Sequence, residues 1–367
     1  MSPQHPLPSG FGAKTAAREL INGRRLDGTT AIVTGGYAGI GLETTRVLAA
    51  AGAHVIVPAR DRAKATVALS GLVNVTIDKL DLGVPATIDA FAIRVGERPL
   101  HLLINNAGIM AAPLSRDARG LESQLAVNHV GHFRLFARLL PALRRANGAR
   151  VVALSSRGHV RSAFDFEDPN FEHRPYDKMV AYGQSKTANV LFAVEADRRY
   201  QADGIRAFSL HPGAILETDL ARNYDPEELK LVVERARRIG SFKTIEQGAA
   251  TTIWCATSAQ LAGLGGVYCR TATLRRSRPR ATMVSGPTRS IRRSHSGCGR
   301  GASAGCRDDG DLPLNLAFLS PPGRCAERRR AELPHVVGDV DQPSLPIAAG
   351  MWRRAPSCRT PTCCRRR

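Results

Sequence analysis

The stretch TAIVTGGYAGIGLETTRVLAAAG (residues 30–52) changes its periodicity at a glycine-rich turn. Residues 30–35 are a short, mostly apolar run that ends in glycine, a pattern typical of a buried strand. Residues 41–52 carry apolar side chains at helical spacing and also end in glycine, which is typical of a helix and its C-terminal cap. The stretch therefore predicts a buried strand, a tight turn and a helix in direct succession.

The same alternation continues to residue 269. Seven apolar strands separated by helices indicate a parallel sheet covered on both faces. With right-handed crossovers this is a doubly wound, Rossmann-like α/β fold, a single domain over residues 28–269 after an N-terminal extension, residues 1–27. The six further strands are predicted at 54–59, 73–81, 100–108, 150–156, 205–213 and 265–269. The further helices are predicted at 61–69, 86–95, 121–145, 180–200 and 245–257.

The composition changes in the C-terminal tail, residues 270–367. The tail holds 20 arginines, no lysine and 7 acidic residues, a net charge of +13 out of +20 for the whole chain. Such a charge indicates an acidic partner such as nucleic acid. The tail has no aromatic interleaving and no recognisable nucleic-acid-binding module, so this partner class ranks last.

Two interpretations of the tail are open. One is a disordered basic extension, because the tail lacks sustained apolar periodicity. The other, which we favour, is translation of GC-rich DNA in a second reading frame. The codons for RTATLRR (270–276), read from their third bases, permit Asp-Cys-Asp-Ile-Ala-Glu. Sequencing the DNA around codon 269 distinguishes the two.

Cysteine usage favours a reducing compartment. Only Cys255 and Cys269 precede the tail, and no spacing suits zinc, so we expect no metal site and a cytoplasmic protein. The N-terminus, MSPQHPLPSGFGAK, has no apolar region of the kind that signal peptides carry. No run approaches the ~18 consecutive apolar residues that a membrane helix needs.

The turn TGGYAGIG (34–41) predicts a dinucleotide site. Gly35, Gly39 and Gly41 allow a tight turn and close backbone approach. The helix that follows offers free N–H groups and a partial positive charge to a pyrophosphate. The spacing is GxxxGxG rather than the commonest GxGxxG, so from this motif alone a glycine-rich turn without a ligand stays open.

The end of the second predicted strand bears on the choice of cofactor. A carboxylate there would accept hydrogen bonds from the ribose 2′-OH of NAD. Arg60 stands at this position and could pair with the 2′-phosphate of NADP. We therefore expect NADP, and the neighbouring Asp61 keeps NAD as the alternative.

The segment AYGQSK (181–186) places Tyr182 and Lys186 at i and i+4, on one face of a predicted helix. A nearby ammonium favours tyrosinate, so the pattern predicts that Lys186 lowers the pKa of Tyr182 toward working pH, as a general acid/base requires. This spacing is also common by chance, and a structural role for both residues is the alternative when the pair is taken alone.

The motifs together resemble the short-chain dehydrogenase/reductase family over about residues 28–269. They are TGGYAGIG, the NNAG of 105–108, Asn128, the serine pair of VALSS, YGQSK and the HPG of 211–213. The resemblance implies that Tyr182 exchanges the proton and that Lys186 lowers its pKa and binds the nicotinamide ribose. It also implies that Ser156 orients the carbonyl or hydroxyl group and that Asn128 holds a water of the proton relay. Ser155 competes with Ser156, which we prefer because it is the second serine of the pair.

The resemblance also implies a set of cofactor contacts that runs from the glycine turn to the nicotinamide. The set is Gly35, Tyr37, Gly39, Ile40, Gly41, Arg60, Asp81, Leu82, Asn106, Ala107, Gly108, Tyr182, Lys186, Pro212 and Gly213.

The segment between Ser156 and Tyr182 resembles the retinol-dehydrogenase-like branch of the family and its bacterial relatives. We expect it to form a loop beside the substrate pocket, with its histidines and acids at the surface rather than on a metal. His129, His132 and His211 are likewise interpreted as structural.

The function expected from these residues is hydride transfer between NADP(H), or NAD(H), and a small-molecule alcohol or carbonyl substrate. The alternatives are a non-catalytic Rossmann protein and a nucleic-acid binder that uses the tail. Loss of the tyrosine or the lysine would favour the first alternative, and both residues are present. The residues leave a homo-oligomer open and do not specify the substrate.

Overall fold

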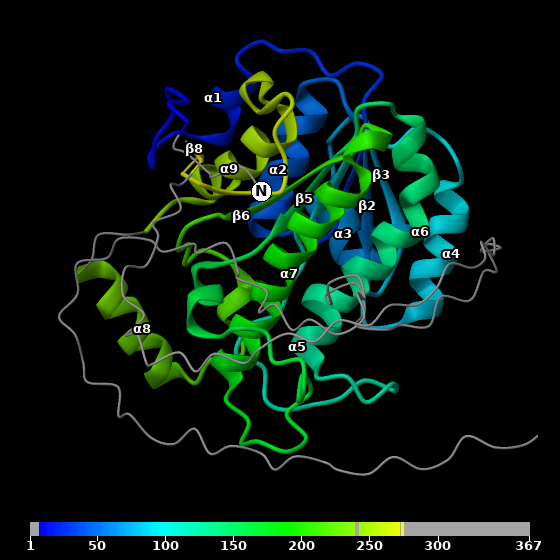
Figure 1. Cartoon of the computed structure of the whole chain (residues 1–367). Coiled ribbons are helices and arrows are strands. Elements are labelled where there is room, and N and C mark those ends of the chain that lie inside the picture. The colour runs from blue at the N-terminus through cyan, green and yellow to red at the C-terminus, as the bar shows by residue number, and fades with distance from the viewer. Residues whose placement is uncertain (1–6, 239–241, 272, 275–367) are drawn as a thin grey trace, which may run out of the picture. The chain divides into compact units, whose positions relative to one another are not determined.

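A computed structural model describes residues 7–238, 242–271 and 273–274 (Figure 1). The described residues form a twisted sheet in the order β3-β2-β1-β4-β5-β6-β7-β8. All pairings from β3 to β7 are parallel, which confirms the seven predicted strands and the Rossmann-like fold. The strands are β1 Thr30–Val33, β2 His54–Ala59, β3 Val75–Lys79, β4 Leu102–Asn105, β5 Arg150–Leu154, β6 Arg206–His211, β7 Val267–Arg270 and β8 Thr273–Leu274.

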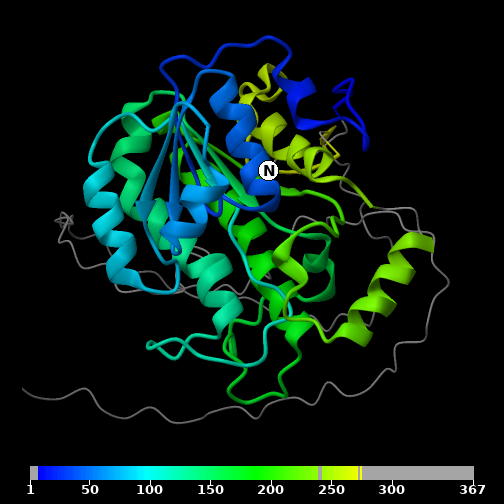
Figure 2. The ribbon, with the colours of Figure 1, turned by 180° about the vertical axis from the view of Figure 1, so that it is seen from behind.

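The helices lie on both faces of the sheet, as the two opposite views show (Figures 1 and 2). The α-helices are α1 Ala17–Ile21, α2 Gly39–Ala50, α3 Arg62–Ala68, α4 Pro85–Val95, α5 Ser123–Leu125, α6 Gly131–Arg145, α7 Lys178–Tyr200, α8 Pro226–Arg238 and α9 Ile245–Thr257. The short helical turns are η1 Ala126–Val130, η2 Arg157–Arg161, η3 Gln201–Asp203, η4 Asp219–Ala221 and η5 Ala259–Leu261.

The apolar core is divided by the sheet into two layers, because successive side chains of a strand point to opposite faces. In β1, Ala31 and Val33 face the layer formed with α1, α2, α3 and α9. Ile32, between them, faces the layer formed with α4, α6 and α7. Burial on both faces explains why these strands are continuous apolar runs rather than alternating ones.

Two elements depart from the sequence pattern. The helix predicted at 121–145 is interrupted, because η1 is a π-turn in which the amide of Gly131 donates to the carbonyl of Ala126. The sheet also continues past the predicted boundary at residue 269, through the antiparallel pair β7–β8. Thr271, with a φ of 58°, makes the tight turn between these strands. The rest of the predicted tail, from residue 275, lies outside the described residues.

The described part of the N-terminal extension packs on α9. Ala17 and Leu20 of α1 are buried in the same cluster as Trp254. Within the described ranges, none of the helices combines the length and the apolar character needed to cross a bilayer.

Candidate active site

The glycine-rich turn between β1 and α2 presents bare backbone. Gly35 and Gly39 have φ angles of 65° and 48°, in the left-handed region that favours glycine. A methyl group on Gly41 would lie 2.2 Å from the carbonyl oxygen of Gly35 and 2.4 Å from Nδ2 of Asn106, so no side chain fits there. Helix α2 starts without a side-chain cap at Ala38. This cradle fits a dinucleotide, because an uncapped helix N-terminus can bind its pyrophosphate.

The end of β4 is fastened to this turn through Thr34. Oγ1 of Thr34 accepts hydrogen bonds from the amides of Asn106 (2.9 Å) and Ala107 (3.0 Å), and Nδ2 of Asn106 donates to the carbonyl of Thr34 (2.8 Å). A methyl group on Gly108 would lie 3.4 Å from Nζ of Lys186. The motifs TGGYAGIG and NNAG thus form one surface that leads to the predicted catalytic lysine.

At the end of β2, the two charged residues have different surroundings. Asp61 is the N-cap of α3, where its carboxylate accepts a hydrogen bond from the amide of Lys64 at 2.9 Å. Arg60 is exposed. The carboxylate that would serve NAD is therefore already engaged in capping a helix.

The segment after β6 covers the glycine turn. Lys64 of α3 forms an exposed ion pair with Asp219 of η4 at 3.0 Å. A methyl group on Gly39 would lie 2.9 Å from Cγ2 of the preceding residue, Thr218. Two consecutive residues of the segment thus contact the turn and α3.

The remaining residues of the predicted cofactor set near the turn and β3 make contacts with the protein itself. Oδ1 of Asp81 accepts a hydrogen bond from the amide of Gly83 at 2.9 Å, and Leu82 is buried. Tyr37 and Ile40 pack against the core cluster beneath α2.

Tyr182 lies on α7 and is buried, with 3% of its surface exposed. Ser156 lies beside it, because a methyl group on Gly158 would be within 3.4 Å of both Oγ of Ser156 and the tyrosine ring. Oγ of Ser156 also accepts a hydrogen bond from the amide of Gly158 at 3.0 Å. The backbone of Gly158 packs closely against the tyrosine ring, since a methyl group there would be 3.1 Å from Cδ1 and Cε1 of the ring. The turn after β5 therefore fixes both partners of the Ser–Tyr pair.

The electrostatics of the pair differ from the prediction. Burial raises the pKa of Tyr182 to about 12, and the nearby side chain of Ser156 opposes that rise. Nζ of Lys186 lies 5.7 Å from the ring centroid and donates to the carbonyl of Leu154 at 3.0 Å. Burial lowers the pKa of Lys186 itself to about 8. In the described protein, desolvation outweighs the charge attraction that the i, i+4 spacing predicts.

The two serines of VALSS face different partners. Oγ of Ser155 donates to the carbonyl of Lys186 at 2.8 Å and is buried, while Oγ of Ser156 accepts from the amide of Gly158, which borders the Tyr182 ring. The alternation of side chains along the strand end accounts for this division.

Asn128 lies in the π-turn η1 and is fully buried. Its Oδ1 accepts a hydrogen bond from the amide of Ile109 at 2.8 Å. Its Nδ2 donates to the carbonyl of Ile109 at 2.9 Å and to Oγ of Ser185 at 3.0 Å. The side chain therefore ties the chain after NNAG to helix α7.

The HPG motif follows β6 at the same edge of the sheet. Nδ1 of His211 accepts hydrogen bonds from the amides of Arg157 and Gly213, both at 3.3 Å. Burial, with nearby cations, lowers the pKa of His211 to about 3, so the ring is neutral. Gly213, which follows Pro212, has a φ of 117° and is covered by the side chain of Lys243.

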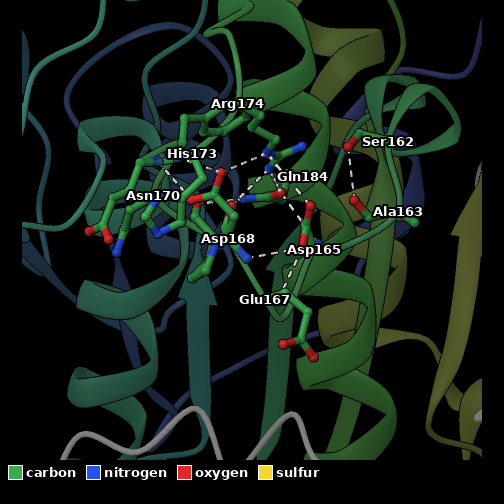
Figure 3. Close-up of polar contacts among 12 residues, drawn as sticks. Ser162, Ala163, Asp165, Glu167, Asp168, Asn170, His173, Arg174 and Gln184 are labelled. Atoms are coloured by element: carbon green, nitrogen blue, oxygen red, sulfur yellow. Dashed lines mark hydrogen bonds and ion pairs between the residues drawn. The ribbon is translucent and has the colours of Figure 1, made fainter. Parts of the chain in front are cut away.

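The segment between Ser156 and Tyr182 is held to α7 by a polar network (Figure 3). Arg174 donates to Oε1 of Gln184 at 2.7 Å, and Gln184 in turn donates to the carbonyl of Pro169 at 2.7 Å. The carboxylate of Asp168 accepts hydrogen bonds from the amides of Glu172 and His173. Among the described residues no group of three or more ligating side chains could hold a metal.

Four residues that contact the predicted site residues or the adjoining loop were not predicted as site residues from the sequence. Gly158 borders Tyr182, and Gln184 bonds to Arg174. His132 and Asn189 both contact the carbonyl of Asn128. Only the one-turn spacing from Lys186 to Asn189 offered a signal. The other contacts depend on how η2, the loop and η1 meet α7 in space.

Comparisons with known proteins identify the family of the chain. A model of the short chain dehydrogenase family matches residues 29–229. A Streptomyces antibioticus protein named "Probable oxidoreductase" is 47% identical over 66% of this chain and 85% of its own. Retinol dehydrogenase 12 of Mus musculus is 39% identical over 66% of this chain and 78% of its own.

Solved structures share the fold. An uncharacterized protein from Mycobacterium Paratuberculosis is 33% identical, with a TM-score of 0.56 over 71% of this chain and 87% of its own. The Pseudomonas aeruginosa RhlG/NADP active-site complex is 27% identical, with a TM-score of 0.55 over 67% of this chain and 95% of its own. The chain therefore belongs to the short-chain dehydrogenase family, and it is a nicotinamide-dependent oxidoreductase.

Proposed function

We propose that the protein interconverts a small-molecule alcohol and its carbonyl compound, with Tyr182 as the general acid/base. The observation that carries this proposal is that Tyr182 and Ser156 both border Gly158 at the end of β5, where a methyl group would lie 3.1 Å from the tyrosine ring and 3.4 Å from Oγ of the serine. A carbonyl oxygen placed against both hydroxyls would receive a proton from Tyr182 and a second hydrogen bond from Ser156. The nicotinamide supplies or accepts the hydride when it is bound.

Lys186 and Asn128 support this proton transfer. Lys186 is held by the carbonyl of Leu154 beside the backbone of Gly108, which suits an ammonium that binds the nicotinamide ribose. An ammonium near the tyrosine stabilises the tyrosinate that proton transfer leaves behind. Asn128 keeps the chain at Ile109 and helix α7 in register, and its place in the proton relay remains a proposal from the family resemblance.

We further propose that NADP(H) is preferred over NAD(H). Arg60 is exposed at the end of β2, and the competing carboxylate of Asp61 caps α3. A guanidinium forms charge-assisted hydrogen bonds with a phosphate. The 2′-hydroxyl of NAD is neutral, so it gives the guanidinium no opposite charge to pair with. The relative RhlG has been solved as an NADP complex, which supports the same choice.

We also propose that the protein works in the reducing cytoplasm. Cys255 and Cys269, the cysteines of the described residues, are free thiols, as expected for a protein of the reducing cytoplasm.

Titration of the purified protein with NADPH and with NADH, followed by cofactor fluorescence, tests the proposed function. We expect tighter binding of NADPH, and a loss of about ten- to one-hundredfold in NADPH affinity in Arg60→Ala, as for one charge-assisted hydrogen bond. Arg98→Ala, at an exposed arginine after α4, is the control and should bind both cofactors normally. A preference for NADH, or unchanged selectivity in Arg60→Ala, would contradict the assignment of Arg60.

A further inference from the structure

A chain of buried hydrogen bonds runs behind the catalytic residues, from α7 to the glycine turn. Its two central side chains are Asn189 of α7, 3% exposed, and His132 of α6, 2% exposed. Neither touches the Tyr182–Ser156 pair. Each nevertheless contacts a backbone carbonyl that belongs to the site, so the chain links parts that the mechanism uses separately.

The Asn189 amide has a defined orientation. Its Nδ2 donates to the carbonyl of Asn128 and to the carbonyl of Leu154, both at 3.1 Å. The carbonyl of Leu154 is also the acceptor for Lys186. Because Nδ2 faces two acceptors, Oδ1 must be the acceptor of the 3.1 Å contact with Nδ1 of His129. Asn189 thus links the carbonyl of Asn128 in η1 to the carbonyl of Leu154 in β5, which Lys186 also contacts.

The tautomer of His132 follows in the same way. Its Nδ1 lies 3.0 Å from the carbonyl of Asn128, which can only accept, so Nδ1 carries the proton. Burial lowers the pKa of His132 to about 3, so the ring is neutral and Nε2 is an acceptor. The hydroxyl of Thr34 has two acceptors within reach, Nε2 at 2.8 Å and the carbonyl of Ile104 at 3.3 Å, and we assign its proton to Nε2, the shorter contact. The lone pairs of that hydroxyl receive the amides of Asn106 and Ala107.

In this chain of hydrogen bonds, the polar side-chain atoms of Thr34, His132 and Asn189 all have partners, and the hydroxyl of Thr34 and the amide of Asn106 also reach the carbonyl of Ile104. The order is Ala107 and Asn106 to Thr34, Thr34 to His132, and His132 to the carbonyl of Asn128, which Asn189 also contacts. Fully satisfied buried networks fix one geometry, since breaking any member leaves a buried polar group unpaired.

We propose that His132 and Asn189 are positioning residues that couple the cofactor-binding turn to Asn128 and Lys186. This inference rests on the proposed function. The His132 ring has two separable arms: Nε2 holds Thr34 and with it the NNAG backbone, and Nδ1 holds the π-turn that carries Asn128. Loss of the first arm disturbs cofactor binding, and loss of the second disturbs the proton-transfer side.

Two substitutions separate the arms. In His132→Asn the amide nitrogen can take the place of Nδ1, so the bond to Asn128 is kept and the bond to Thr34 is lost. In His132→Gln the longer side chain can present an oxygen near the place of Nε2, so the bond to Thr34 is kept and the bond to Asn128 is lost. We expect His132→Asn to weaken NADPH binding about tenfold while kcat at saturating cofactor stays near wild type. We expect His132→Gln to bind NADPH normally and to lose about tenfold in kcat.

A third substitution addresses the other residue. Asn189→Asp replaces the donor that faces two carbonyls by an acceptor, so it should lower kcat and leave the NADPH Kd unchanged. The control is His101→Asn, because His101 pairs with the amide of Thr30 at the opposite end of β1 and β4. That control should retain the wild-type Kd and kcat whatever it does to the melting temperature.

The measurements are the NADPH Kd, kcat, KM and Tm of each variant. A weaker NADPH Kd in His132→Asn with little change in kcat, together with a lower kcat in His132→Gln with little change in Kd, supports the coupling. Equal loss of both quantities in both variants, in proportion to a fall in Tm, would show a merely structural role and overturn it. Wild-type protein that binds neither NADPH nor NADH would overturn the proposed function, and this inference with it.

Discussion

Gly41 offers the sharpest test of the cofactor cradle. A methyl group there would lie 2.2 Å from the carbonyl oxygen of Gly35, whereas real Cβ atoms essentially never approach closer than 3.0 Å. Gly41→Ala therefore forces the turn and the first turn of α2 apart by roughly 1 Å, and the clashing neighbour is backbone that cannot rotate away. Displacements of about this size can cost on the order of 100-fold in function when they affect positioned groups.

The effect of Gly41→Ala on stability can be measured separately from its effect on NADPH affinity. Overpacking of this kind costs about 1–3 kcal/mol of folding free energy, and ~2–4 °C per kcal/mol in a domain of this size predicts a Tm lower by roughly 2–12 °C. NADPH affinity, measured by fluorescence titration below the new Tm, should fall by about 100-fold, because the amides of the helix N-terminus no longer face the pyrophosphate.

Gly12→Ala is the matched control, since a methyl group on Gly12 meets nothing within 4 Å. It should change neither Tm nor affinity. If Gly41→Ala binds NADPH as tightly as Gly12→Ala does, the turn does not hold the pyrophosphate and the cradle is wrongly placed.

Two further substitutions test the catalytic pair. Tyr182→Phe should retain cofactor binding and lose ~10²–10⁴-fold in turnover, the usual contribution of a general acid/base, and near-normal turnover on a substrate found by screening would remove Tyr182 from the mechanism. Lys186→Met should abolish turnover yet raise Tm at pH 7, because the folded state buries an ammonium whose pKa is lowered to about 8 while the unfolded chain keeps it in water. That gain in Tm should shrink as the pH rises from about 8 toward 10.5, where the unfolded lysine also loses its proton, and an equal gain at both ends of the range would contradict it.

Periodicity predicted the fold well, because the side chains of both core layers come from apolar patterns within single strands and helices. The run at 30–35 became β1, and its alternate side chains went to opposite layers. The interruption of the helix at 121–145 was not predictable, because apolar spacing does not distinguish an α-turn from the π-turn η1. β8 was missed because two residues carry no periodicity.

The site was predictable where a motif names the residue and unpredictable where burial decides its chemistry. The pair of Tyr182 and Lys186 follows from spacing, but the direction of the tyrosine pKa follows from how deeply α7 is packed. His132 and Thr34 are 98 positions apart in the chain, so their contact required the fold.

The segment after β6 has a consequence for the kinetics of turnover. Thr218 lies against Gly39, and the next residue, Asp219, forms the exposed ion pair with Lys64, so the segment lies beside the turn proposed to hold the pyrophosphate. An exposed ion pair contributes only ~0–1 kcal/mol and weakens as salt is added. We therefore expect the segment after β6 to move aside when oxidised cofactor is exchanged for reduced cofactor. The rate of this exchange should increase with ionic strength, even though each cofactor is itself an anion.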